Sequence, residues 1–183
     1  MKLSMMTILE DAAKKAKQSG SMVAFFIPPA TGKEIQEVYS DVPGDMVKPK
    51  DMHITIGLVH GFSGKEKKIK RVLDKVAESY KPMMCRIKSF ETFEPNEHNE
   101  NKWVLYAKPE FLSDDIQEFR DYCHKKMKKY GIDIDNGSFD FSPHITVKYC
   151  SEEPDLGREI DQEFILDSIY FAIGDKHWRS KLG

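Results

Sequence analysis

Apolar and polar positions along the chain follow two different periods. Short apolar runs bounded by Gly, Pro or other turn-forming residues predict β-strands. These runs lie at 22–27, 52–59, 84–93, 102–107, 143–150, near 163–173 and at 177–182. Apolar residues at helical spacing predict helices. These stretches lie at 5–19, 65–80 and 113–130, with a weaker one at 32–39. We expect strands 84–93 and 102–107 to pair as a hairpin.

Residues typical of helix ends divide the chain into a short extension and one main domain. The helix at 113–130 can be capped by Ser113 and ended by Gly131. The helix at 5–19 is followed by Gly20 and has the character of an appendage. No low-complexity linker interrupts the rest of the chain. We therefore expect a helical extension at 1–20 and a single domain at 21–183.

Composition and charge narrow the classes of function. Twenty-eight Lys and Arg against 30 Asp and Glu give a formal charge of -2, so the chain has no general basic field for long duplex nucleic acid. No apolar run approaches the roughly 20 residues that cross a bilayer. The three cysteines are far apart and form no CxxC pair, which argues against a disulfide framework or a structural zinc site. These features indicate a cytoplasmic protein.

A short repeat carries most of the functional information. Met52-His53-Ile54-Thr55-Ile56 recurs as Pro143-His144-Ile145-Thr146-Val147, and each copy follows a turn and opens an apolar strand. Successive side chains of a strand point to opposite faces. Each copy therefore presents one histidine and one threonine to the same surface and turns its Ile or Val toward the core. A single copy is most simply a structural feature, whereas two copies in equivalent settings predict a shared site.

Two histidines and two threonines suit displacement at phosphorus. Such a reaction needs a base for the nucleophile, an acid for the leaving oxygen, and hydrogen-bond donors to the nonbridging oxygens. His53 and His144 can act as base and acid, because imidazole titrates near neutrality. Thr55 and Thr146 can supply the donors. The sequence contains no HExxH, EF-hand or phosphate-loop motif, so we expect no metal and no cofactor.

At these residues the chain closely resembles the 2H phosphoesterase superfamily, the 2',5'-RNA ligase and cyclic phosphodiesterase group. The resemblance rests on the doubled H-x-T, with Phe141-Ser142-Pro143 before the second copy, and on the order of elements over 21–182. It implies an α+β, bilobal fold in which two antiparallel sheets with pseudo-twofold symmetry form a cleft, with helices packed outside. It also implies that His53, Thr55, His144 and Thr146 are the catalytic residues.

The resemblance also indicates substrate classes, and this sequence departs from the pattern of the superfamily in two places. Known substrates of the superfamily include 2',3'-cyclic phosphates, 2'-5' linkages and cyclic oligonucleotide signals. The stretch MVAFFIPP before the first motif is similar to 2H domains carried by bacteriophages. Gly57 stands where many relatives have a larger apolar residue, and the helix at 5–19 is not part of the common domain.

Further candidates for substrate binding are led by Lys148, Phe25 and Tyr149. Lys148 continues the face of His144 and Thr146 along the strand and could reach a phosphate oxygen. An aromatic ring could stack on a base, and the candidates are Phe25 or its neighbour Phe26, Tyr149, and Phe139 or Phe141. Strand aromatics more often belong to the core. His60, His98, His124 and His177 are expected to have surface or structural roles.

The sequence thus predicts a metal-independent phosphodiesterase that acts on a nucleotide 2',3'-cyclic phosphate, a 2'-5' linkage or a small cyclic oligonucleotide. Expected partners are a nucleotide or short RNA, without a membrane or long duplex, and we expect a monomer. One alternative is a nucleotide- or RNA-binding module that uses the same cleft without turnover. Ligation is the reverse chemistry and is disfavoured in about 55 M water.

Overall fold

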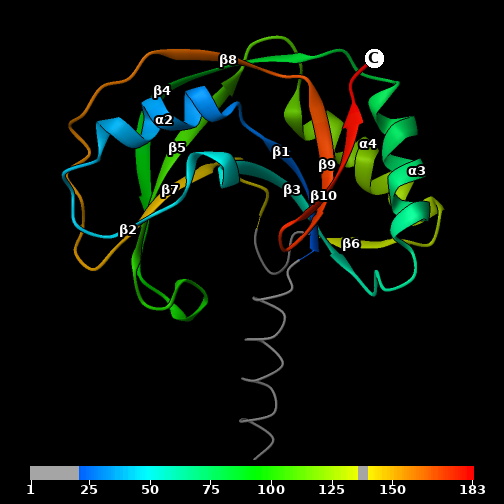
Figure 1. The fold of residues 1–183 in the computed structure, drawn as a ribbon, viewed down its shortest axis with the longest axis horizontal. Helices are drawn as coiled ribbons and strands as arrows, with labels where there is room; N and C mark the ends of the chain where they lie inside the picture. The colour runs from blue at the N-terminus through cyan, green and yellow to red at the C-terminus, as the bar shows by residue number, and fades with distance from the viewer. Residues whose placement is uncertain (1–20, 136–139) are drawn as a thin grey trace, which may run out of the picture.

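The computed structural model describes residues 21–135 and 140–183. In these two ranges the chain forms two five-stranded antiparallel sheets and three α-helices (Figure 1). The predicted helix at 5–19 and the expected extension at 1–20 lie outside the described residues.

The first sheet contains both ends of the described chain. Its strands, in spatial order, are β10 (Lys176–Lys181), β9 (Ser168–Ile173), β1 (Ser21–Phe26), β3 (His53–His60) and β6 (Asp133–Asp135). The second sheet is formed by β2 (Asp45–Met46), β7 (Ile145–Cys150), β5 (Trp103–Phe111), β4 (Met83–Phe93) and β8 (Gln162–Leu166). The predicted hairpin is confirmed as the antiparallel pair β4 and β5.

The two sheets are related by pseudo-twofold symmetry. Each motif strand lies between a more central strand of its sheet and a short edge strand. For β3 these neighbours are β1 and β6, and for β7 they are β5 and β2. Figure 1 shows the sheets as two halves of an arch, with the tips of the β4–β5 and β9–β10 hairpins extending to its concave side. β3 and β7 contact each other where the halves meet.

The helices pack on the apolar faces of the sheets. They are α2 (Pro29–Val38), α3 (Glu66–Ala77) and α4 (Ile116–Lys129), and short 3-10 turns cover Pro49–Asp51 and Glu97–Asn99. The predicted stripe of α3 is buried, with Ile69 and Leu73 fully inaccessible. Phe119 of α4 lies 5.1 Å, between ring centroids, from Phe25 of β1, on the face of the first sheet opposite His53. None of the helices in the described part of the chain is long and apolar enough to cross a membrane.

Several local predictions need correction. Asp115, not Ser113, caps α4, because its carboxylate accepts from the backbone N–H groups of Gln117 and Glu118 at 2.8 and 3.2 Å. Ser113 accepts instead from the N–H of Met84 at 3.0 Å, so it ties the start of α4 to β4. The short strands β2 and β6 are absent from the sequence prediction.

Each motif strand contains one extra residue immediately after its threonine. Ala24 pairs with Thr55 but Val23 pairs with Gly57, so Ile56 has no partner in the ladder. On β7, the same skip leaves Val147 unpaired between Thr146 and Lys148. An extra residue breaks the alternation of faces. Both strands accordingly bury two consecutive residues after the threonine before the next side chain becomes accessible.

The extra residue on β3 is held by a buried histidine. The Nε2–H of His124, on α4, donates to the carbonyl of Ile56 at 2.8 Å. A Cβ at Gly57 would lie 2.5 Å from this Nε2 and 2.8 Å from Cγ1 of Ile134. The absence of a side chain at Gly57 is therefore needed for His124 to reach the strand.

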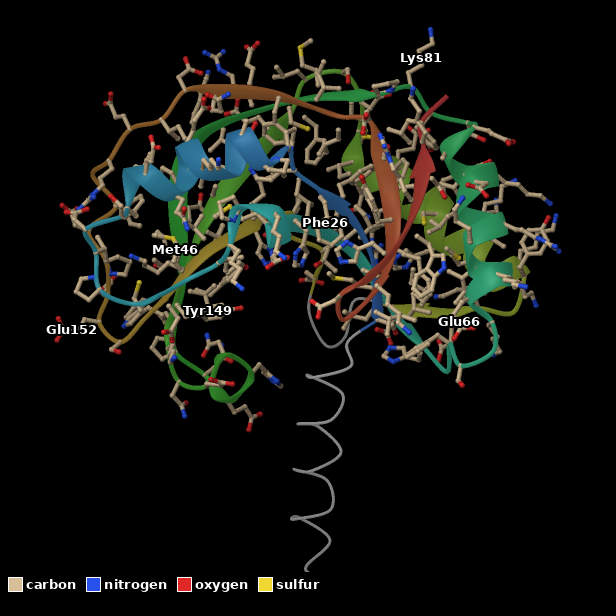
Figure 2. All side chains as sticks on the ribbon, viewed as in Figure 1. Phe26, Met46, Glu66, Lys81, Tyr149 and Glu152 are labelled. Atoms are coloured by element: carbon tan, nitrogen blue, oxygen red, sulfur yellow. The ribbon has the colours of Figure 1, made fainter. Side chains whose placement is uncertain are left out.

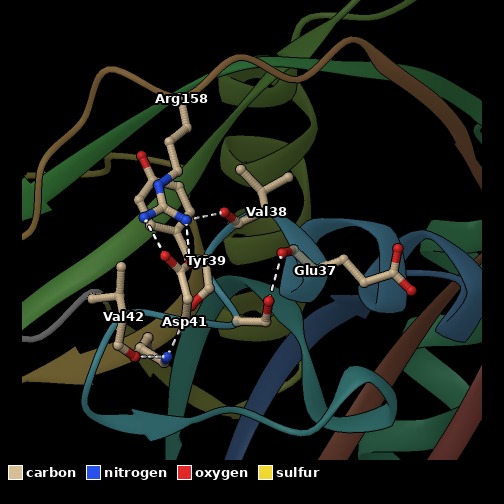
Figure 3. A network of polar contacts seen from close by, with 8 residues as sticks. Glu37, Val38, Tyr39, Asp41, Val42 and Arg158 are labelled. Carbon is tan, nitrogen blue, oxygen red and sulfur yellow. Dashed lines mark hydrogen bonds and ion pairs between the residues drawn. The ribbon is translucent and has the colours of Figure 1, made fainter.

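A polar network anchors β7 to the segment after α2 (Figure 3). The ammonium of Lys148 donates to the carbonyls of Tyr39, at 2.9 Å, and Val42, and the residue is only 2% exposed. Arg158 donates to the carbonyl of Val38 at 2.6 Å, pairs with Asp41, and lies 4.8 Å from the centroid of the Tyr39 ring. The network thus joins three segments that are distant in sequence.

Gly57→Ala is expected to destabilise the fold by about 1 to 3 kcal/mol, because the new methyl group overlaps His124 and Ile134. Urea unfolding measures this loss. The double variant with His124→Ala should lose less than the sum of the two single changes, because the same contact is counted in both. Gly157→Ala is the matched control, since its nearest neighbour is a flexible aspartate side chain at 3.3 Å. Equal losses at the two glycines would contradict this account.

Lys148→Met should lower the free energy of unfolding by about 1 to 3 kcal/mol, because it leaves the buried carbonyl of Tyr39 and the partly buried carbonyl of Val42 without this donor. Lys102→Met is the control. Lys102, directly before β5, pairs with the exposed carboxylate of Asp45 on β2. Such surface pairs contribute about 0 to 1 kcal/mol to stability. Chemical denaturation of both variants makes the comparison, and a loss no larger at Lys148 than at Lys102 would refute a structural role.

Candidate active site

Both motif histidines are oriented by the same local hydrogen bond. The Nδ1–H of His53 donates to the carbonyl of Asp51 at 2.7 Å, and the Nδ1–H of His144 donates to the carbonyl of Ser142 at 2.8 Å. A carbonyl can only accept, so it selects the Nδ1–H tautomer of the neutral ring. In each histidine the Nε2 atom is therefore left to take or give a proton.

Burial lowers the pKa of both imidazoles. For His53 the largest cause is desolvation, opposed by the hydrogen bond to Asp51, and the positive charges of His144 and His177 lower its pKa further. Desolvation likewise lowers the pKa of His144, opposed by its bond to Ser142. The strands that carry the two histidines, β3 and β7, contact each other, and Thr55 and Thr146 line one cavity. The structure thus brings together the two motifs that are distant in sequence.

A cavity of about 490 Å³ opens beside the motifs. Thr55 and Thr146 both line it, one from each sheet, and both are partly exposed. The remaining lining residues are Gly57, Leu58, Phe93, Asn96, His98, Asn99, Val104, Asp140, Phe141, Ser142, His144 and Tyr149. Lys and Arg are missing from this set of described residues. The hydroxyl and imidazole groups are therefore its main donors for an anionic ligand.

One wall of the cavity is a stacked aromatic pair. The Phe93 ring lies 4.3 Å, between centroids, from that of Tyr106 at an interplanar angle of 23°, and it meets His144 edge-on at 4.9 Å. The hydroxyl of Tyr106 donates to Glu91 at 2.7 Å, and Glu91 also accepts from Lys108 at 2.7 Å. Burial and this carboxylate raise the pKa of Tyr106. These polar contacts hold the Tyr106 ring in place, and Phe93, which stacks on it, lines the cavity.

The tip of the β4–β5 hairpin closes the same side. Asn96 accepts from the N–H of His98 at 2.8 Å, and Asn99 accepts from the N–H of Asn96 at 2.7 Å. Both amides also donate to the carbonyl of Glu94. These bonds define the shape of a tip that the sequence marks only as a polar turn.

The three predicted substrate-binding residues have different positions. Tyr149 lines the cavity. Phe25 is 0% exposed and packs on Phe119, so placing it at the substrate surface was wrong. Lys148 is also misplaced by the sequence argument, because the extra Val147 turns its side chain inward to the carbonyls of Tyr39 and Val42.

Other aromatic residues near the site are only partly anticipated. Phe141 lines the cavity, and Phe139 lies outside the described residues. Phe26, rather than Phe25, pairs in register with His53, and its ring centroid is 5.4 Å from that of His53. Phe93 and His177 are absent from the predicted site. Their positions depend on strand pairings that bring β4 and β10 to the cleft, which periodicity along one segment does not reveal.

Three residues of the two motifs, Thr55, His144 and Thr146, line one cavity, and His53 lies on the strand of Thr55 with its side chain on the same face. The aromatic wall of the cavity suits a planar ring, and its polar groups suit a phosphate. Within the described residues, no group of three or more His, Cys, Asp or Glu side chains is arranged to hold a metal ion.

Solved structures show the same fold. TT0787 of Thermus thermophilus aligns with a TM-score of 0.66 at 15% identity, covering 87% of this chain and 97% of that chain. The MHV ns2 PDE domain aligns with a TM-score of 0.60 at 12% identity, covering 84% and 99%. E. coli LigT complexed with 3'-AMP aligns with a TM-score of 0.59 at 12% identity, covering 88% and 98%. A comparison with curated protein sequences gives no match.

The family follows from the sequence. The family described as the AKAP7 2'5' RNA ligase-like domain matches residues 30–181, which include both motifs and nearly all of the two sheets. The resemblance expected from the doubled H-x-T is thereby confirmed, and the family supports a function of the phosphodiesterase type. On this match and on the shared fold, the chain belongs to the AKAP7 2'5' RNA ligase-like domain family of the 2H phosphoesterase superfamily.

Proposed function

We propose that the chain is a metal-independent phosphodiesterase that hydrolyses a nucleotide 2',3'-cyclic phosphate, a 2'-5' linkage or a small cyclic oligonucleotide. The observation that carries the proposal is the equivalent orientation of His53 and His144, each with its Nδ1 engaged by a carbonyl and its Nε2 left for proton transfer. A site that only binds a nucleotide does not require two such groups. The complex of the structural neighbour LigT with 3'-AMP is consistent with a nucleotide ligand.

The reaction divides among four side chains. One neutral histidine removes a proton from water as the water oxygen forms a bond to phosphorus. The other histidine, protonated at Nε2, gives its proton to the ribose oxygen as that oxygen leaves phosphorus. Thr55 and Thr146 donate to the nonbridging oxygens, whose charge is redistributed in the transition state. The two histidines exchange protonation states in one turnover, and the pair returns to its starting state through solvent.

His53→Ala and His144→Ala should each lower turnover by about 10²- to 10⁴-fold, because each removes one proton-transfer group. The double variant should lose much less than the product of the two factors, since the groups act as a unit. Initial rates on adenosine 2',3'-cyclic phosphate and 2'-5'-linked diadenosine, followed by mass spectrometry in EDTA, provide the measurement. Thermal melts check folding.

His60→Ala is the control for these variants, because His60 is exposed at the far end of β3, where it pairs with Asp135. A folded double variant that hydrolyses these substrates at the wild-type rate would overturn the assignment. A wild-type chain that binds them but leaves every mass unchanged would favour the binding module.

The pH dependence of kcat/KM should be bell-shaped with its maximum below about pH 6.5, the ordinary pKa of histidine. Activity needs one neutral and one protonated imidazole, and desolvation lowers the pKa of both His53 and His144. The rate therefore falls on the alkaline side as the acid loses its proton, and on the acidic side as the base gains one. Rates at constant ionic strength between about pH 4 and 9 test this, and a maximum above about pH 6.5 would contradict it.

A further inference from the structure

Positive charge is concentrated on one part of an otherwise acidic chain. Residues 65–75 and 125–129 contain ten of the 28 Lys and Arg residues but only two of the 30 Asp and Glu residues. The first range covers most of α3, and the second forms the end of α4. Because the formal charge of the whole chain is -2, the remaining sequence is strongly acidic. The two ranges are therefore a local exception to the charge of the molecule.

Antiparallel packing of α3 and α4 brings the two ranges side by side. The start of α3 lies at the end of α4, because the ammonium of Lys68 is 4.0 Å from the position that a Cβ would take at Gly131. The end of α3 lies farther back along α4, where the hydroxyls of Ser79 and Tyr122 are 3.1 Å apart. The two helices thus carry most of their basic residues toward the same end of the pair.

Five basic side chains of the two helices form one surface. On α3, three of them recur at i, i+3 and i+7, which is the spacing of a single helix face. Tyr130, at the end of α4, lies between the helices, and its hydroxyl accepts from the ammonium of Lys75 at 3.0 Å. This bond lowers the pKa of the phenol, and the charges of Lys75, Lys129 and Lys126 lower it further. We call the five side chains the α3–α4 basic surface: Lys68, Arg71, Lys75, Lys126 and Lys129.

The stability of the fold does not account for these charges. Within the described part of the chain, none of the five side chains forms an ion pair. Lysines in the last turn of α4 suit the negative end of a helix, but the first turn of α3 is a positive end, where acidic residues are favoured. Lys67 and Lys68 lie in that first turn, and Lys65 at the N-cap makes no capping bond. The basic residues of α3 thus oppose the helix dipole and repel one another, and an external anion would offset both effects.

The α3–α4 basic surface and the cleft lie toward the same side of the molecule. Figure 2 places Glu66, in the first turn of α3, on the side of the arch to which the hairpin tips extend, and Lys81, beyond the end of α3, on the opposite side. α4 itself reaches the rim of the cavity, because the guanidinium of Arg120 lies 5.3 Å from the ring centroid of Phe141, a lining residue. At a rise of about 1.5 Å per residue, Lys126 lies about 9 Å beyond Arg120 along the axis of α4. A chain of phosphates could therefore follow α4 from this surface to the cavity.

A single strand of nucleic acid is the anionic partner that fits this arrangement. The described lining of the cavity contains no Lys or Arg, so the cavity has hydrogen-bond donors for one phosphate but no cations for a chain of them. Neutralisation of backbone phosphates by Lys and Arg is the main source of sequence-independent affinity for nucleic acids. A membrane-surface helix also needs exposed apolar side chains. Among the described residues, the large exposed ones all lie outside α3 and α4: Leu58, Met84, Leu112, Leu156 and Ile165.

We propose that the α3–α4 basic surface binds the phosphate backbone of single-stranded RNA and that the strand follows α4 into the cavity. RNA rather than DNA is inferred because the proposed reactions involve the ribose 2'-oxygen. The substrate class is then an RNA strand that extends several nucleotides past the cleaved linkage, rather than a free mononucleotide or dinucleotide. The inference rests on the proposed function for the cleaved linkage and adds the partner.

Charge reversal by the double change Lys68→Glu and Arg71→Glu tests the surface. The probe is a fluorescein-labelled 2'-O-methyl oligoadenylate of about 12 nucleotides, within the usual size of a single-strand site. Fluorescence anisotropy at several salt concentrations gives the dissociation constant. The variant should bind the probe about tenfold more weakly than wild type. Its plot of log K against log salt concentration should be shallower by about 1.4, at about 0.7 for each lost phosphate contact.

The double change Lys33→Glu and Lys88→Glu is the matched control, because both lysines are exposed, lie on α2 and β4, and alter the net charge equally. It should leave the salt slope unchanged, since it removes no phosphate contact. Lys126→Gln with Lys129→Gln, on α4, should weaken binding as the α3 variant does, which keeps the test decisive where one variant fails to fold in a thermal melt. Equal constants for wild type and both surface variants, or an equal loss in the control, would overturn the surface.

Vesicles that contain phosphatidylserine test the other source of phosphate. Co-sedimentation of wild type, lost in the surface variants and without binding of the oligoadenylate, would assign the surface to a membrane and overturn the inference.

Hydrolysis separates this inference from the proposed function. For a 2'-5' linkage at the end of an oligoadenylate of about 12 nucleotides, the Lys68→Glu and Arg71→Glu variant should lower kcat/KM about tenfold. For 2'-5'-linked diadenosine, kcat/KM should stay unchanged. Binding of the oligoadenylate that is weakened in the surface variants supports the surface, even if the wild type hydrolyses nothing and the phosphodiesterase assignment fails. Equal binding by wild type and variants overturns the surface, even if hydrolysis is observed.

Discussion

The hydrogen bond from each motif histidine to the carbonyl two residues earlier is the interaction on which the site depends. It needs a carbonyl two residues before the histidine that faces back at the ring, and Asp51, at the end of a 3-10 turn, and Ser142, in an irregular segment before β7, both provide one. The bond fixes the proton on Nδ1 without introducing a carboxylate partner. Because a carboxylate would raise the pKa of the ring, its absence from this bond leaves burial as the dominant influence on both histidines.

The extra residue after each threonine is the second constraint, and it determines which later side chains reach the cavity. With regular alternation, the second residue after the threonine would share its face. The skip at Ile56 and Val147 transfers that position to the third residue, so Leu58 and Tyr149 line the cavity, whereas the side chain of Lys148 is directed away from it. The backbones of the two copies stay equivalent while the side chains differ, which allows a symmetric frame to hold an asymmetric ligand.

Sequence patterns predict most of the frame because they record burial within single segments. The apolar runs locate the main strands, the stripe of α3 is correct, and the doubled motif identifies Thr55, His144 and Thr146, which line one cavity. The failures arise where pairing between strands decides. Lys148 is misplaced because an unpaired residue leaves no mark in the alternation. The choice between Phe25 and Phe26 depends on the register with β3, and His177 reaches the site only through the order β10, β9, β1.

The asymmetry of the surroundings bears on how two chemically similar histidines could take different roles. Both rings have the same tautomer, the same type of hydrogen bond and a pKa lowered mainly by burial, so neither is intrinsically the acid. On the His144 side, the β4–β5 hairpin and the stacked rings of Phe93 and Tyr106 bound the cavity. On the His53 side, the partly exposed ring of Phe26 and the exposed ring of His177 lie on the first sheet. A ligand with unlike ends would orient by these surfaces. In the proposed hydrolysis, the leaving oxygen would then face one histidine and water the other, so the orientation of the ligand would assign the base and the acid.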